Sequence, residues 1–160
     1  MFPRFKLSSV ALGVLLAATL AWTADYTGPR PPKPDLVYLM HADNLIPAEA
    51  AEAKQEKNDT YTVAGATSPA RTPLAEPIFL MQSDKITPES LELYRLDVKS
   101  GHREITLSGG RRRGGPRALH LSVTKVERGL YRIEAAETLE NGEYALTPSG
   151  SNKVFCFEVF

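Results

Sequence analysis

The chain has 160 residues, of which 24% are charged, and its 19 lysines and arginines balance 19 aspartates and glutamates. This length fits one domain with a modest core, and the balanced charge gives no global reason to bind nucleic acid. The single cysteine, Cys156, excludes an internal disulfide, so the core must supply the stability. We expect Cys156 to be a small buried hydrophobe in an apolar strand, with a free thiol or an intermolecular disulfide both left open.

The first 24 residues have the pattern of a secretory signal helix. Arg4 and Lys6 give it a positive start, and residues 7–21 are apolar or small throughout. This apolar stretch is shorter than the roughly 20 residues that span a membrane, which favours cleavage, after Ala21 or Ala24, over retention as an anchor. Because cleavage removes only two basic residues, the remainder stays nearly neutral. We expect it to be exported to the periplasm or the extracellular space.

Residues 25–35 contain four prolines and predict an extended, proline-rich spacer. The remainder, 36–160, is expected to form a single domain that begins with a hairpin over residues 36–46. Residues 47–57 favour helix by composition but offer nothing larger than alanine to bury. They predict either an exposed short helix or an edge segment.

Runs of apolar residues, many of them alternating with polar ones, predict the later strands. Between residues 91 and 98 the apolar positions change phase after Leu93, which indicates a bulge or a crossing between two sheets. A turn at Ser100 and Gly101 then forms a hairpin, in whose second strand Ile105 shares a face with the stem of Arg103. The segments expected to be strands after the first hairpin are 61–64, 77–81, 91–98, 103–107, 118–126, 130–135, 144–147 and 154–160.

Residues 139–144 have the spacing of a tyrosine corner. Tyr144 begins the penultimate strand, and its hydroxyl is expected to donate to an upstream backbone group. Gly142 allows the close approach and Leu139 seals the corner beneath it. Because many Greek-key sandwiches end with such a corner, a strand, a turn and a final strand, we predict an all-β, antiparallel Greek-key, immunoglobulin-like sandwich.

The C-terminal half resembles small uncharacterised exported bacterial β-sandwich proteins. The resemblance covers roughly the last eighty residues and depends on GEYALTP at 142–148 and VFCF at 154–157, preceded by LYRL at 93–96 and Arg103-Glu104. It implies the sandwich fold and export. It implies no activity and carries over no catalytic residue.

The corner and the final hairpin are also loosely similar to immunoglobulin-like copper-resistance proteins of the periplasm. The chain departs from that pattern, because it has only Met40 and Met81 after the signal and no histidine at either expected new N-terminus. The three histidines, His41, His102 and His120, match no metal-binding spacing. We therefore expect no metal and no other cofactor.

A glycine-flanked loop concentrates four arginines in an otherwise neutral chain: Arg111, Arg112, Arg113 and Arg117. Arginine forks match phosphate, sulfate and carboxylate, so the loop is a candidate anion site. The alternative is a solvated flexible connection, favoured by the glycines and by the absence of an interleaved aromatic residue.

Nothing in the sequence predicts catalysis. The chain has no Gly-x-Ser-x-Gly elbow, and Cys156 lies in an apolar strand where a thiolate is disfavoured. The leading hypothesis is a non-catalytic binding or structural module of the bacterial envelope or secreted fraction, whose partner is another exported protein. The alternatives are a binder of glycan, lipopolysaccharide or nucleic acid through the loop from Arg111 to Arg117, and an unrecognised hydrolase or metal-dependent enzyme.

Overall fold

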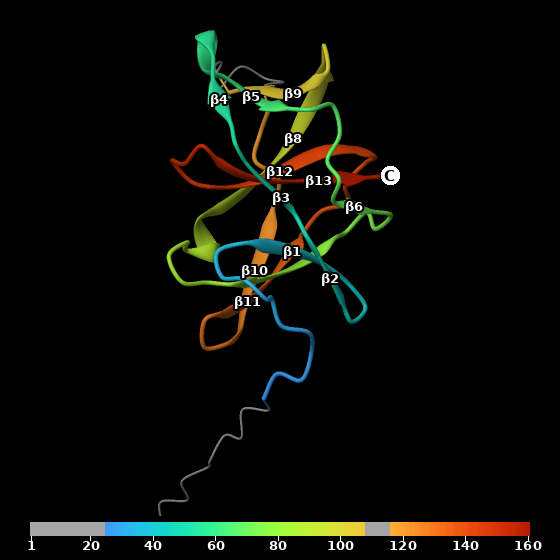
Figure 1. The fold of residues 1–160 in the computed structure, drawn as a ribbon, viewed down its shortest axis with the longest axis vertical. Coiled ribbons are helices and arrows are strands. Elements are labelled where there is room, and N and C mark those ends of the chain that lie inside the picture. The colour runs from blue at the N-terminus through green and yellow to red at the C-terminus, as the bar shows by residue number, and fades with distance from the viewer. Residues whose placement is uncertain (1–24, 108–115) are drawn as a thin grey trace, which may run out of the picture.

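The computed structural model describes residues 25–107 and 116–160, whose regular elements are β-strands and two single 3₁₀ turns (Figure 1). No α-helix occurs in these two ranges, so the predicted all-β class is confirmed. The signal segment, 1–24, lies outside the described residues. The strands are β1 (Val37–His41), β2 (Asn44–Pro47), β3 (Glu49–Glu52), β4 (Lys54–Gln55), β5 (Thr60–Ala64), β6 (Arg71–Thr72), β7 (Ile78–Gln82), β8 (Leu91–Lys99), β9 (His102–Thr106), β10 (Leu121–Glu127), β11 (Leu130–Ala135), β12 (Gly142–Pro148) and β13 (Lys153–Val159), and the 3₁₀ turns are η1 (Lys57–Asp59) and η2 (Pro88–Ser90).

The strands form two sheets, which are antiparallel apart from the short strand β6. The smaller sheet has five strands in the order β10-β11-β7-β1-β2, and the larger follows the order β3-β13-β12-β8-β9-β5-β4. β6 pairs in parallel with β13. In Figure 1 the smaller sheet lies low in the picture, and β4, β5 and β9 of the larger sheet lie at the top.

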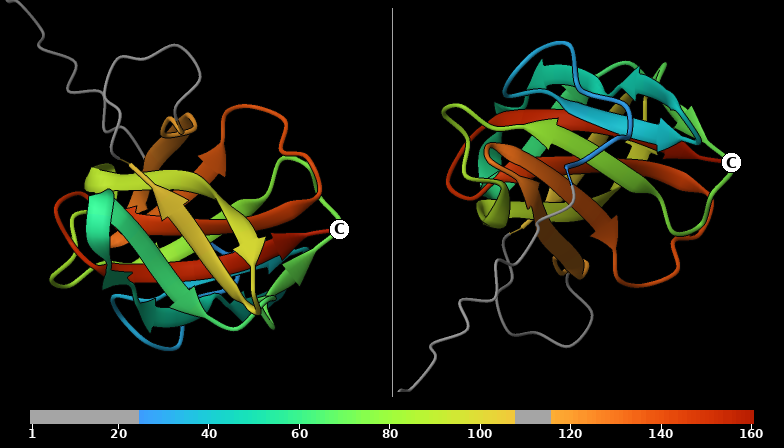
Figure 2. Two further views of the ribbon diagram at one scale, coloured as in Figure 1. Left: turned by 90° about the horizontal axis from the view of Figure 1, so that it is seen from above. Right: turned by 90° about the horizontal axis from the view of Figure 1, so that it is seen from below.

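The larger sheet closes almost completely into a barrel because one stretch of chain supplies both of its ends. Only Ala53 separates β3 from β4, and β3 pairs with β13 while β4 pairs with β5. Only Ala48 separates β2 from β3, so residues 44–55 leave the smaller sheet and continue along the seam of this seven-stranded barrel. The left view of Figure 2 shows β5, β8 and β9 in front of β12 and β13.

The main hydrophobic core lies between the barrel and the smaller sheet. Phe79 of β7 contacts Phe157 of β13 edge to face, with ring centroids 5.0 Å apart, and Tyr144 of β12 stacks on Phe157 at 5.5 Å. All three side chains are buried. Burying each such side chain contributes about 1.5–3 kcal/mol, so this layer holds the two sheets together.

A second, smaller core fills part of the barrel interior. Successive residues of β12 and β13 point to opposite faces, so Tyr144 and Phe155 enter the main core while Ala145 and Cys156 face the barrel interior. Both faces of these strands are therefore buried. This explains why the VFCF segment is continuously apolar rather than alternating.

β8 contributes to both cores from its two faces. Leu93 packs in the main core, whereas Leu96 packs in the barrel interior with Tyr94 against it. The pairing of β8 with β12 runs without a register shift from Leu91 to Leu96, so the change of phase marks two buried faces of one regular strand rather than a bulge.

Residues 47–55 contain no helix. The exposed short helix, which was one of the two predicted alternatives for the segment 47–57, is therefore wrong for these residues. β3 and β4 carry this segment, and Ala51 and Ala53 face the barrel while Ala50 and Glu52 are exposed. Alanine favours helix in isolation, but the backbone hydrogen bonds offered by β13 and the narrow barrel interior outweigh that preference here.

The expected tyrosine corner lies where the connection from β11 enters β12. The Tyr144 hydroxyl donates to the Glu140 carbonyl oxygen at 2.7 Å, and Leu139 is buried. A side chain at Gly142 would place its Cβ 3.4 Å from the Arg95 guanidinium, which itself donates to the neighbouring Asn141 carbonyl oxygen. The corner therefore fixes the entry into β12.

The side chains of Arg30 and Asp35 attach the proline-rich segment 25–35 to the domain. Arg30 forms an ion pair with Glu127 at the end of β10. The Asp35 carboxylate accepts backbone hydrogen bonds from three successive residues, of which Lys85 and Ile86 donate at 2.9 Å. Burial opposes ionisation of Asp35, but these backbone donors lower its pKa below the ordinary value.

Candidate functional site

A cavity of about 340 Å³ opens into the barrel where β4 leads to β5 and β12 turns into β13. Its volume falls at the lower end of the roughly 300–1,000 Å³ typical of small-molecule sites. Barrel strands and the β12–β13 turn supply its walls. The lining residues are Ala53, Gln55, Tyr61, Val63, Glu92, Tyr94, Leu96, Ile105, Leu107, Ala145, Thr147, Pro148, Gly150, Ser151, Asn152 and Val154.

The cavity exists because small side chains occupy inward positions. Interiors of narrow barrels are normally filled by side chains. Here Ala53, between β3 and β4, faces inward together with Ala145 of β12 and Val154 of β13, where larger residues would meet across the barrel. The free space is therefore encoded by residue size.

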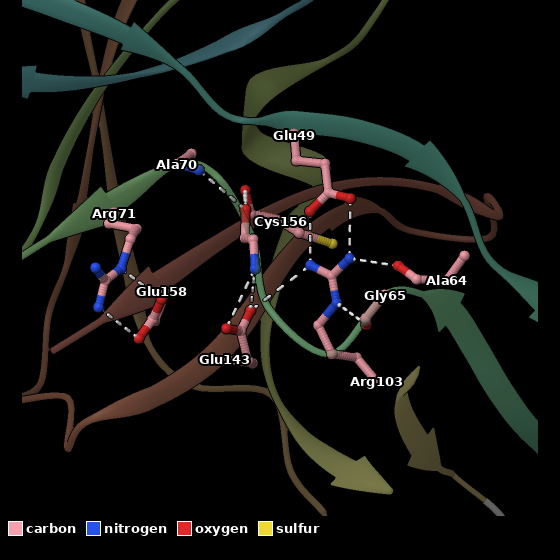
Figure 3. Close-up of polar contacts among 10 residues, drawn as sticks. Glu49, Ala64, Gly65, Ala70, Arg71, Arg103, Glu143, Cys156 and Glu158 are labelled. Carbon is pink, nitrogen blue, oxygen red and sulfur yellow. Dashed lines mark hydrogen bonds and ion pairs between the residues drawn. The ribbon is translucent and has the colours of Figure 1, made fainter. Parts of the chain in front are cut away.

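The opposite end of the barrel is closed by a buried arginine (Figure 3). Arg103 of β9 has no exposed surface, and its guanidinium forms a bidentate pair with Glu49 of β3 at 2.6 and 2.9 Å. It also donates to the carbonyl oxygens of Gly65 and Ala64 at 2.9 and 2.7 Å. A buried arginine is tolerated only where its charge is paired and its N–H groups have acceptors. Here Glu49 and the two carbonyl oxygens meet both needs.

Glu143 of β12 completes this cluster. Its carboxylate lies 3.6 Å from the Arg103 guanidinium and accepts from the Ser68 backbone N–H at 3.1 and 3.2 Å. Burial raises the pKa of Glu143, and the charge of Arg103 only partly opposes this. Among the residues that the structure describes, no buried side-chain nitrogen or oxygen lacks a hydrogen-bond partner.

On several strands, inward-facing residues two positions apart belong first to the closed end of the barrel and then to the cavity. On β9, Arg103 belongs to the closed end and Ile105 to the cavity, and on β12 Glu143 stands in the same relation to Ala145. The pairing of Glu49 with Cys156 on the closed side continues to Ala51 with Val154 nearer the cavity. The barrel interior is therefore ionic at the closed end, apolar in the middle and open at the other end, which is called the mouth below.

The mouth carries a fixed polar pair on β8. Glu92 and Tyr94 are two residues apart and share the inward face, and the Tyr94 hydroxyl donates to the Glu92 carboxylate at 3.0 Å. Burial, and to a lesser extent the neighbouring Glu92 carboxylate, raises the pKa of Tyr94 to about 12. Tyr94 therefore stays a protonated donor at neutral pH and holds Glu92 at the cavity wall.

The arginine loop predicted as an anion site is only partly described. Arg111, Arg112 and Arg113 lie outside the described residues. Arg117 is exposed and forms a bidentate pair with Glu137 at 2.7 and 3.1 Å. A carboxylate of the chain itself thus occupies the fork of this arginine.

The histidines lie apart from one another in the fold. His41 bonds the Thr72 hydroxyl, His102 contacts Glu104, and His120 lies beside Glu137. Within residues 25–107 and 116–160, no three histidine, cysteine, aspartate or glutamate side chains gather in a way that could hold a metal ion.

Cys156 is buried in the barrel interior, as its apolar strand indicated. Burial raises the pKa of its thiol to about 12, despite the opposing charge of Arg103. The thiol is therefore protonated at neutral pH and is a poor nucleophile.

None of the helical elements in the described part of the chain has the length and apolar character needed to cross a membrane.

The sequence pattern does not identify the residues that shape this site. It predicts a buried stem for Arg103 but assigns no role in a site to Glu49, Glu92 or Tyr94. One signal was present: Arg103 occupies an inward position in the alternation that includes Ile105. A charged residue at such a position indicates a buried partner of opposite charge.

Comparisons with family models, with curated proteins and with solved structures give no match for this chain. The geometry of the barrel and its cavity therefore carries the functional argument alone.

Proposed function

We propose that this protein is a non-catalytic, exported binding module whose barrel cavity holds a small ligand with an apolar body. The observation that carries the proposal is the cavity itself, which is closed at one end by the Arg103 cluster and lined in its middle by Ala53, Leu96 and Ala145. Barrels with free interior volume are suited to holding one small ligand. The export signal expected in residues 1–24 supports the compartment.

The chemistry of the lining supports binding rather than turnover. In the part of the chain that the structure describes, Glu92 is the sole aspartate, glutamate, lysine, arginine or histidine that lines the cavity. Acid–base catalysis requires groups that exchange protons with a substrate, and nucleophilic catalysis requires an activated nucleophile beside a base. The polar groups at the closed end are already engaged with one another.

We also propose that the strands follow the Greek-key, immunoglobulin-like order. The corner at Tyr144 and the β12–β13 hairpin that follows it support a Greek-key, immunoglobulin-like arrangement. The near closure of the larger sheet is an addition to that arrangement, and it creates the interior in which the ligand would lie.

Binding can be tested with N-phenyl-1-naphthylamine, a neutral apolar dye whose fluorescence rises in an apolar site. The purified protein should bind it, and Ala145→Leu, which extends a side chain into the cavity, should weaken binding at least tenfold. Ala50→Leu makes the same change at an exposed position of β3 and serves as the matched control.

A second filling variant, Ala53→Ile, guards against a folding defect in the first. Any filling variant that keeps the wild-type circular dichroism and cooperative unfolding should lose the dye. Absence of binding by the wild type, or equal binding by wild type and a folded filling variant, would contradict the proposed cavity function.

A further inference from the structure

The charges that face the cavity are unbalanced. Within residues 25–107 and 116–160, Glu92 is the one charged residue that lines it, and its carboxylate is held at the wall by the Tyr94 hydroxyl, a neutral donor. Among the residues that the structure describes, no lysine or arginine lines the cavity. A carboxylate beside an apolar cavity creates a negative potential that favours a cation at the mouth.

The lysines and arginines on neighbouring strand positions lie on other faces. Lys153 and Arg95 occupy the β13 and β8 positions that alternate with inward residues; Lys153 lies over the Phe155 ring, and Arg95 pairs with Glu140. Lys54 of β4 alternates with inward Gln55 and lines a separate groove on the outside of the barrel. The strand period therefore directs these cations away from Glu92.

Aromatic side chains also line the cavity. Tyr61 of β5 pairs with Ile105 of β9, and Tyr94 lies on β8, the other neighbour of β9. Tyrosine rings attract organic cations by their negative faces. The Glu92 carboxylate, the two tyrosines and the apolar wall together suit a ligand with a cationic head and an aliphatic body.

We propose that the ligand of the barrel is an organic cation, an amine or quaternary ammonium with an aliphatic body. The head lies beside Glu92 at the mouth, and the body lies against Leu96 and Ala145. The free space of about 340 Å³ lies at the lower end of the range of small-molecule sites, which suits a short aliphatic chain. This inference rests on the proposed binding function and specifies its ligand class.

The test compares three probes with one chain length and different heads: octyltrimethylammonium, octanol and octyl sulfate, each competing with the neutral dye. The wild type should bind the ammonium about tenfold more tightly than octanol, as a partly shielded ion pair with an aromatic contact would give. The sulfate should bind most weakly, and added salt should reduce the ammonium preference.

Glu92→Gln keeps the shape of the side chain and removes its charge. It should retain octanol and dye binding and lose the ammonium preference, whereas Glu89→Gln, which removes an exposed carboxylate of η2 outside the lining, should behave as wild type. Preference for the sulfate, or an unchanged ammonium preference in Glu92→Gln, overturns the cation assignment while leaving a binding cavity. Failure of all three probes and of the dye overturns the proposed function as well.

Discussion

The two faces of the barrel wall differ in the size of the side chains that they bury. Toward the smaller sheet, β12 and β13 present Tyr144, Phe155 and Phe157, whose rings fill the space between the sheets. Toward the barrel interior, the same strands present Ala145 and Cys156. One set of strands therefore builds a dense structural core on one side and leaves a cavity on the other.

The difference separates stability from binding within a single domain. The main core and the Arg103 cluster hold the barrel in shape, so the small residues of the cavity are not required to fill it. A change in the dense layer should therefore destabilise the protein, whereas a change at the cavity should alter binding with less effect on stability.

The largest expected effect comes from the closed end of the barrel. Arg103→Met should lower the free energy of unfolding by about 3–5 kcal/mol, because it leaves Glu49 and Glu143 beside each other without a cation. Urea unfolding at neutral pH measures the change. Arg132→Met breaks a half-exposed pair with Glu134 and should cost less than about 1 kcal/mol; equal losses in the two variants would show that the cluster does not stabilise the barrel.

A smaller effect should distinguish the two faces of β8. Leu93→Ala should cost about 3–4 kcal/mol, because Leu93 is fully enclosed between the sheets and its removal leaves an empty space. Leu96→Ala should cost about 2 kcal/mol, because water from the adjoining cavity can enter the space that it leaves. Chemical unfolding of both variants checks the order, and a larger loss for Leu96→Ala would contradict a water-accessible interior.

The smallest effect concerns a surface carboxylate and its dependence on pH. The hydrogen bond from Arg117, with the His120 backbone N–H, lowers the pKa of Glu137 from 4.5 to about 2. Because the folded pKa is the lower one, Glu137 stabilises the fold above about pH 4.5 and loses that contribution as the pH falls toward 2.

Glu137→Gln should therefore lose less stability than wild type between pH 4.5 and pH 2, measured by urea unfolding across that window. Glu89→Gln, another exposed carboxylate, is the control and should follow the wild-type curve. Parallel curves for Glu137→Gln and wild type would show that the Arg117 pair contributes nothing in solution.

Strand positions could be predicted from the sequence where burial follows local pattern. Residues 118–126 alternate cleanly and overlap β10 over residues 121–126, and the apolar run at 77–81 overlaps β7 almost completely. The Tyr144 hydroxyl reaches the upstream backbone as its spacing predicted. These features depend on neighbours in sequence or on one half-buried face.

The closure of the barrel and the cavity could not be predicted in the same way. Closure depends on residues 49–55 pairing with β13 on one side and with β5 on the other, and both pairings are distant or ambiguous in sequence. The alanines of this segment indicate helix by propensity, and only the assembled barrel shows that small inward residues leave free space. The partners of Arg103 likewise come from strands far apart in the chain.

Intermolecular nuclear Overhauser effects between bound octyltrimethylammonium and the methyl groups of the protein show most directly whether the ligand lies inside the barrel. We expect contacts from the octyl chain to Ala53, Leu96 and Ala145, with none to Leu93 on the opposite face of β8. Contacts confined to the exposed side chains of Leu74 and Val98 would place the probe outside the barrel and contradict binding in the cavity.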